Sequence, residues 1–157
     1  MTSTFRVAAI QTVSTPRVDE NLALCAAMID SAAEQGARLV LLPEYFCLMP
    51  MSEPDKIGQR EPLGRGPIQD FLSSYARKHS LWIIGGTVPL ADEKPDRIRN
   101  TVLVFGPQGE RVARYDKIHL FAYDNGKESY NEAQTIVAGS DVVTFECNRP
   151  GEPALKV

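Results

Sequence analysis

Two kinds of apolar periodicity alternate along the first half of the chain and predict alternating strands and helices. Short apolar runs typical of buried strands occupy residues 5–10, 39–42 and 81–88. Between them, apolar residues recur at helical spacing over residues 19–36 and again over residues 67–79. A strand-helix-strand unit normally places its two strands side by side and parallel. We therefore expect an α/β fold in which residues 5–10 form a central strand and residues 39–42 form a strand buried on both faces.

The second half of the chain predicts antiparallel pairing. Residues 100–105 and 110–115 flank Gly106-Pro107-Gln108-Gly109, a composition typical of a hairpin turn. Residues 141–147 alternate between apolar and polar positions as a strand does, and residues 154–157 begin another apolar run. The sequence thus predicts a hairpin followed by two further strands.

Glycine and proline interrupt the periodic pattern in three places. Residues 47–65 contain no regular periodicity and predict a long loop, which in a compact domain is usually functional. Residues 122–139 form a second irregular segment, which is polar. Gly85 and Gly86 lie inside the third apolar run, where paired glycines favour a bulge or the close approach of another backbone.

Length and composition are typical of one folded domain, which we expect to span residues 1–157. The hydrophobic fraction of 43% argues against disorder, and a net charge of -3 gives no reason to expect nucleic acid or an anionic membrane as a partner. We expect a cytoplasmic protein, because the sequence shows neither a signal-peptide pattern nor a membrane-spanning apolar run. Three cysteines without Cys-x-x-Cys spacing and only two histidines predict no disulfide framework, no metal site and no cofactor.

A carboxylate follows directly after the apolar run at residues 39–42. Pro43 ends the strand because proline has no amide hydrogen for the ladder, so Glu44 is placed just beyond the strand tip. Tyr45 and Phe46 follow it and can exclude water, which favours a general base at Glu44. Taken alone, however, a Pro-Glu pair is more often part of a solvated loop.

A lysine follows the second arm of the predicted hairpin. Lys117 begins the stretch Lys-Ile-His-Leu-Phe and is surrounded by aliphatic and aromatic residues. A fixed cation of this kind can stabilise an oxyanion if the fold brings it near Glu44. Without that proximity, Lys117 would be an ordinary lysine at the end of a strand.

Together, Leu-Pro-Glu at residues 42–44 and Lys-Ile-His-Leu-Phe at residues 117–121 resemble the nitrilase, or carbon-nitrogen hydrolase, superfamily. The branch that contains omega-amidase and deaminated glutathione amidase is the most similar, and the resemblance extends from Phe5 to the last residue. It implies an alpha-beta-beta-alpha sandwich of two similar halves and a Glu-Lys-Cys triad. Glu44 would be the general base of that triad, and Lys117 would stabilise the tetrahedral intermediate.

The resemblance also implies a second glutamate in a supporting role. Glu132, within Tyr130-Asn131-Glu132-Ala133, matches this position, although Ala133 stands where the family has serine. Glu128 lacks the aromatic residue two positions before it and is interpreted as a solvated loop charge.

The nucleophilic cysteine of the family lies in a segment that resembles Val-Gly-x-x-x-Cys-Tyr-Asp, which this sequence does not contain. Residues 155–157 resemble the strand that leads into it. We therefore expect a domain that is incomplete at its C-terminus, with the inner face of its sheet exposed. Cys47 and Cys147 match no nucleophile motif, and Cys25 lies on the apolar face of a predicted helix.

Two functional hypotheses follow. The resemblance implies an amidase that hydrolyses a small carboxylate-bearing amide, with the cysteine beyond residue 157. The alternative is a catalytically inactive domain that keeps the scaffold and binds the amide or pairs with a second polypeptide. A nucleotide-binding doubly wound domain would need a glycine-rich turn after residues 5–10, and Gln11-Thr12-Val13-Ser14 is not one. The sequence does not distinguish among small amide substrates, and it is compatible with a homo-oligomer of the full-length protein.

Overall fold

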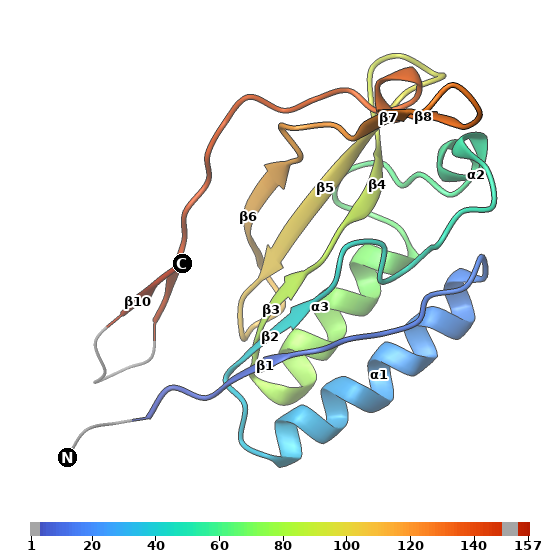
Figure 1. Cartoon of the computed structure of the whole chain (residues 1–157). Helices are drawn as coiled ribbons and strands as arrows, with labels where there is room; N and C mark the ends of the chain where they lie inside the picture. The colour runs from blue at the N-terminus through green and yellow to red at the C-terminus, as the bar shows by residue number, and fades with distance from the viewer. Residues whose placement is uncertain (1–3, 149–153) are drawn as a thin grey trace.

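The computed structural model describes residues 4–148 and 154–157 and shows a mixed sheet with two long helices packed against one face (Figure 1). The six strands of the sheet are β1 (Val7–Ala9), β2 (Leu39–Leu42), β3 (Trp82–Gly85), β4 (Val88–Ala91), β5 (Ile98–Phe105) and β6 (Arg111–Asp116). The order is β1-β2-β3-β5-β4, and β6 also pairs with β5. The pairs β1-β2 and β2-β3 are parallel, and β5 is antiparallel to β3, β4 and β6. Both the parallel neighbours and the β5-β6 hairpin confirm the sequence predictions.

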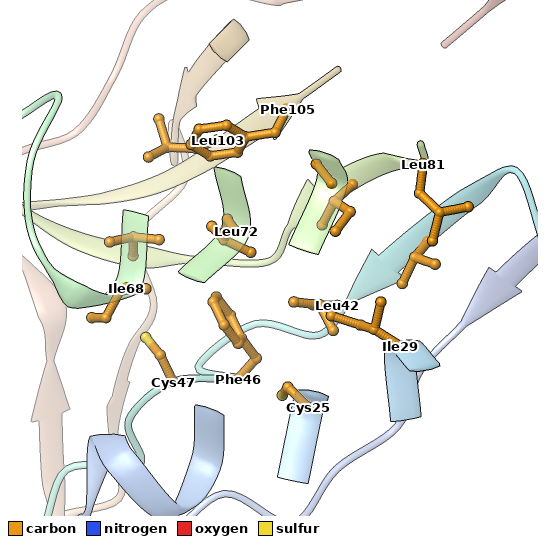
Figure 2. Close-up of a cluster of buried hydrophobic side chains, with 14 of the residues drawn as sticks. Cys25, Ile29, Leu42, Phe46, Cys47, Ile68, Leu72, Leu81, Leu103 and Phe105 are labelled. Atoms are coloured by element: carbon orange, nitrogen blue, oxygen red, sulfur yellow. The ribbon is translucent and has the colours of Figure 1, made fainter. Parts of the chain in front are cut away.

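Helices α1 (Val18–Glu34) and α3 (Pro67–His79) form the layer that covers the sheet. Their apolar stripes and the inward residues of the strands make one buried core, in which each fully buried aliphatic side chain contributes about 2 kcal/mol. Figure 2 shows part of this core, including Cys25 and Ile29 of α1, Leu42 of β2, Leu72 of α3 and Leu103 of β5. Within the described residues, no helix combines the length and apolarity needed to cross a bilayer.

The remaining elements are short. They are α2 (Glu53–Gly58), β7 (Ala122–Asp124), β8 (Ser129–Asn131), the 3-10 helix η1 (Glu132–Gln134), β9 (Glu146–Cys147) and β10 (Leu155–Lys156). The pairs β7-β8 and β9-β10 form two separate antiparallel hairpins.

One prediction about strand position is wrong, and one about strand burial holds only in part. In the described part of the chain, β1 lies at an edge of the sheet and pairs only with β2, whereas a central strand was expected. Val40 and Leu42 of β2 are buried against the helices. On the opposite face Leu39 is also buried, but Leu41 is 40% exposed. The apolar run at residues 39–42 therefore did not reveal that one face of the strand would be partly uncovered. The incomplete domain, in contrast, did lead us to expect an exposed inner sheet face.

Three predictions about continuity are also corrected. The run at residues 81–88 contains the whole of β3 and only the start of β4, because the strand is interrupted at Gly86 and Thr87. Both β3 and β4 pair antiparallel with β5, so the chain keeps its direction across the interruption. A Cβ atom on Gly86 would lie 2.1 Å from the Pro43 carbonyl oxygen, so the expected close approach of another backbone is confirmed. The segment 47–65 is not wholly irregular, because it contains α2 with a capping box formed by Ser52 and Asp55. Residues 141–147 form a strand only at β9, which pairs with β10.

Candidate active site

A turn at the end of β2 presents Glu44. The Phe46 N–H donates to the Pro43 carbonyl at 3.2 Å and closes this turn, and Tyr45 adopts a left-handed backbone with φ of +56°. The Glu44 side chain is 47% exposed, and its Oε1 accepts a hydrogen bond from Asn100 Nδ2 at 2.9 Å. The side-chain amide of Asn100 on β5 thus holds one oxygen of Glu44, while the Glu44 carboxylate stays accessible to a reactant.

Lys117 directly follows β6, and its backbone is fixed on both sides. Its N–H donates to the Asn100 carbonyl at 2.9 Å, and its own carbonyl accepts from the Gly139 N–H at 2.9 Å. The side chain is 22% exposed, and Nζ lies 3.1 Å from Glu44 Oε1 and 2.9 Å from Glu132 Oε2. One ammonium group therefore bridges two carboxylates.

Glu132 begins η1, and its side chain is 10% exposed. Oε2 accepts from the Phe121 N–H at 2.7 Å, and Oε1 accepts from the Tyr45 hydroxyl at 3.0 Å. Burial alone would raise the pKa of Glu132, but the hydrogen bonds from Phe121, Lys117 and Tyr45 outweigh burial and bring this pKa below the usual value. Glu132 is thus a fixed carboxylate at neutral pH.

The two glutamates stabilise the charge on Lys117. Partial burial would lower the pKa of the amine, but hydrogen bonds and charge from Glu132 and Glu44 outweigh this effect and raise the pKa above its usual value. Lys117 is therefore a positioned cation, which is the property needed to stabilise a developing oxyanion.

The structure brings Glu44, Lys117 and Glu132 together, so the condition placed on Lys117 is met. Glu128 is exposed in the turn between β7 and β8. No sequence pattern indicated Asn100, whose side-chain amide donates to Glu44 from β5. Tyr45 was expected to exclude water, but its hydroxyl also contacts Glu132.

A cavity of about 380 Å³ opens beside Glu44 on the sheet face opposite the helices. Leu41, Ile84 and Val102 contribute apolar surface to it, and Thr87 and Glu44 contribute polar groups. The site therefore combines an apolar surface with a carboxylate at its margin, as expected for a small-molecule pocket.

All three cysteines of the chain lie among the described residues, and all three are buried. Burial raises the pKa of the Cys25 and Cys147 thiols to about 11. Cys47 is 1% exposed, its thiol contacts the Thr87 carbonyl at 3.4 Å, and burial raises its pKa even further. These groups stay protonated at neutral pH and are poor nucleophiles. Residues 4–148 and 154–157 contain no group of three histidine, cysteine or carboxylate side chains that could hold a metal ion.

Comparison with known proteins gives the family. The sequence profile described as carbon-nitrogen hydrolase matches residues 6–149. The chain belongs to the carbon-nitrogen hydrolase family. Human omega-amidase NIT2 is 36% identical over 153 residues, an overlap that covers 93% of this chain and 51% of that protein. The mouse omega-amidase NIT2 is 33% identical over 156 residues and is covered to the same 51%.

Solved structures of this family agree with the fold. Nit3 of Saccharomyces cerevisiae, a member of branch 10 of the nitrilase superfamily, superposes with a TM-score of 0.77 at 29% identity and covers 91% of this chain and 51% of that one. The NitFhit protein of C. elegans gives 0.78 at 26% identity, covering 87% and 34%. This carbon-nitrogen hydrolase chain therefore spans about half the length of the curated relatives it matches.

Proposed function

We propose that this chain supplies the general base and the oxyanion-stabilising cation of an amidase that hydrolyses a small carboxylate-bearing amide. Glu44 is the base, Lys117 is the cation, Glu132 supports Lys117, and the cysteine nucleophile lies beyond residue 157. The observation that carries the proposal is the position of Lys117 Nζ, 3.1 Å from Glu44 and 2.9 Å from Glu132. The named omega-amidases among the relatives support the substrate class.

The first half of the reaction is acylation. The Glu44 carboxylate accepts the proton of the cysteine thiol, and the sulfur attacks the amide carbon to form a C–S bond. The carbonyl oxygen becomes an oxyanion, and the Lys117 ammonium group stabilises its charge. Protonated Glu44 then donates its proton to the amide nitrogen, the C–N bond breaks, ammonia leaves and a thioester remains.

The second half is hydrolysis of the thioester. Glu44, again a carboxylate, accepts a proton from water while the hydroxyl oxygen attacks the thioester carbon. Lys117 stabilises the second tetrahedral intermediate, and its collapse breaks the C–S bond and releases the carboxylic acid. The thiolate recovers its proton from Glu44, so each half uses the same two side chains of this chain.

A non-catalytic binding domain is the second candidate, and the burial of Cys25, Cys47 and Cys147 favours it for the 157 residues taken by themselves. Such a domain would retain the cavity beside Glu44 and bind the amide without turnover. The two candidates differ in whether a covalent adduct forms when the gene product is expressed in full, from its start codon to its stop codon.

Single-turnover mass spectrometry of that gene product with succinamate, a short dicarboxylic monoamide, tests the proposal. We expect an acyl adduct on a cysteine outside residues 1–157, with its rate of formation reduced about 100-fold or more in Lys117→Met and Glu44→Gln. Lys78→Met is the matched control, because Lys78 pairs with exposed Asp30 on the helical layer. Normal adduct formation in both site variants would overturn the roles of Glu44 and Lys117, whereas binding without any adduct would support the binding domain.

A further inference from the structure

Tyr45 connects the turn that carries Glu44 to the supporting glutamate. Its backbone adopts the left-handed region with φ of +56°, which is unusual for a bulky residue. Its N–H donates to Thr87 Oγ1 at 2.9 Å, and its carbonyl accepts from the Leu48 N–H at 3.2 Å. A conformation of this kind persists only where its surroundings hold it, and such positions concentrate at functional sites.

The Tyr45 hydroxyl acts on the carboxylate that faces Lys117. It donates to Glu132 Oε1 at 3.0 Å, and the same oxygen lies 3.2 Å from Lys117 Nζ. The other oxygen of Glu132 accepts from the Phe121 N–H. With a neutral donor on each oxygen, the carboxylate group is held against rotation and keeps both oxygens within reach of the ammonium group.

Lys56 of α2 lies against the ring of Tyr45. It is 4% exposed, and its Nζ lies 4.9 Å from the ring centroid, within the range of a cation–π interaction. This contact adds to the interactions that fix the ring. The segment that follows Glu44 therefore folds back through α2 onto the site.

We propose that Tyr45 and Lys56 are positioning residues: the Tyr45 hydroxyl orients Glu132 so that Lys117 is shared between Glu132 and Glu44, and Lys56 holds the Tyr45 ring in place. The catalytic value of this arrangement rests on the proposed function, whereas the orientation of Glu132 does not. If Tyr45 served only as an apolar wall, its hydroxyl would have no effect on Glu132.

The proton affinity of Glu132 tests this proposal directly. Carbon-13 NMR titration of the side-chain carboxyl, assigned by its absence in Glu132→Gln, should show a higher pKa for Glu132 in Tyr45→Phe than in the unmodified protein, because one donor to the carboxylate is lost. Tyr115→Phe is the matched control, since the Tyr115 hydroxyl accepts from the Ile118 N–H, and should leave this pKa unchanged. An unchanged Glu132 pKa in Tyr45→Phe would overturn the proposal.

A double-variant cycle tests the part played by Lys56. If Lys56 acts through the tyrosine hydroxyl, Lys56→Met should raise the Glu132 pKa in the unmodified protein and have no further effect in the Tyr45→Phe background. An equal rise in both backgrounds would show a direct charge effect and overturn the role assigned to Lys56.

Kinetics of the gene product expressed in full separate this inference from the proposed function. Tyr45→Phe should lower kcat by about fivefold to tenfold with little change in KM, as expected for the loss of one orienting hydrogen bond. Unchanged kcat despite a shifted Glu132 pKa would overturn the catalytic value of the positioning. Full activity of Glu44→Gln and Lys117→Met would instead overturn the proposed function and leave the titration result intact.

Discussion

The ammonium group of Lys117 lies 3.1 Å from the carboxylate of Glu44, although 73 residues separate them in the chain. Glu44 stands at the end of the parallel strand β2, and Lys117 follows the antiparallel strand β6. The intervening strands β3 and β5 bring these two ends to the same region of the sheet. The single positive charge of Lys117 therefore offsets the repulsion between two neighbouring carboxylates, Glu44 and Glu132.

Removing the Lys117 ammonium group should change how the free energy of unfolding depends on pH. The folded-state pKa of Glu132 is lowered, so its contribution is present above the unfolded value of 4.5 and is lost as pH falls through the folded value. The folded-state pKa of Lys117 is raised, so its contribution is present below 10.5 and is lost as pH rises through the folded value. Both contributions are present at pH 7.

We expect Lys117→Met to reduce the free energy of unfolding by about 2 kcal/mol at pH 7 and by much less at an acidic pH below the lowered folded-state pKa of Glu132, where that side chain is protonated and no longer needs a cation. Urea unfolding at the two pH values measures the difference. Lys78→Met, which removes one of the two groups paired with Asp30 near the surface and leaves His79 in place, should change little at pH 7. A loss that is equal at both pH values would show that Lys117 contributes by packing rather than by charge.

The turn that carries Glu44 depends on Gly86. This residue has φ of +41°, and a Cβ atom would lie 2.1 Å from the Pro43 carbonyl oxygen and 2.9 Å from the Phe46 ring. Gly86→Ala should therefore destabilise the protein by about 3 kcal/mol and displace Glu44 from Lys117. Thermal unfolding and the NMR signals of the Glu44 carboxyl measure the two effects.

Gly126→Ala is the matched control for this substitution. Gly126 also has a positive φ, of +80°, but no atom lies within 4 Å of the position of a Cβ. It should lose only about 1 kcal/mol, the cost of the left-handed backbone. Equal losses at the two glycines would show that backbone strain, and not contact with Pro43, explains the effect at Gly86.

Local patterns were enough to predict the central part of the fold and the positions of Glu44 and Lys117. The helical spacing before Gly36 predicted α1, and the apolar run after it predicted β2. The hairpin composition at residues 106–109 predicted the β5-β6 pair that delivers Lys117. Each of these features is encoded within a single helix, strand or turn, which is the range that periodicity and turn chemistry cover.

Contacts between distant residues could not be predicted in this way. The Tyr45 hydroxyl meets Glu132 across 87 positions, and Asn100 reaches Glu44 across 56. The edge position of β1 likewise depends on which strands pair, not on the apolar content of that strand. In contrast, α2 had a local signal, the capping box of Ser52 and Asp55, which the density of proline and glycine obscured.

Glu61 is a buried carboxylate that stabilises the start of α3. It is 4% exposed, and it accepts hydrogen bonds from the Ile68 N–H at 2.6 Å, the Gln69 N–H at 3.1 Å and Gln69 Nε2 at 3.0 Å. Backbone donors at a helix N-terminus have no intrahelical partners, and a negative charge there is favourable.

Glu61→Ala should therefore reduce the free energy of unfolding by about 2 to 3 kcal/mol, because buried donors lose a charged acceptor. Glu128→Ala, at an exposed position in the turn between β7 and β8, should stay within about 0.5 kcal/mol of the unmodified protein. Chemical denaturation compares the two variants. A loss at Glu61 no larger than that at Glu128 would show that water replaces the carboxylate at the helix start.

The three thiols should be unreactive in the folded 157-residue chain. Alkylation requires an accessible thiolate, whereas Cys25, Cys47 and Cys147 are buried and burial raises the pKa of each. Iodoacetamide at pH 7.5 should label none of them on the timescale that labels free cysteine, and all three in urea, as mass spectrometry would show.

The folded 157-residue chain should also hydrolyse no succinamate, because a base and a cation without a nucleophile cannot form the thioester. Cys47 is the critical position, since it lies three residues after Glu44. Turnover that disappears in Cys47→Ser but persists in Cys147→Ser would show that Cys47 becomes exposed and acts as the nucleophile, and would overturn its assignment as a core residue.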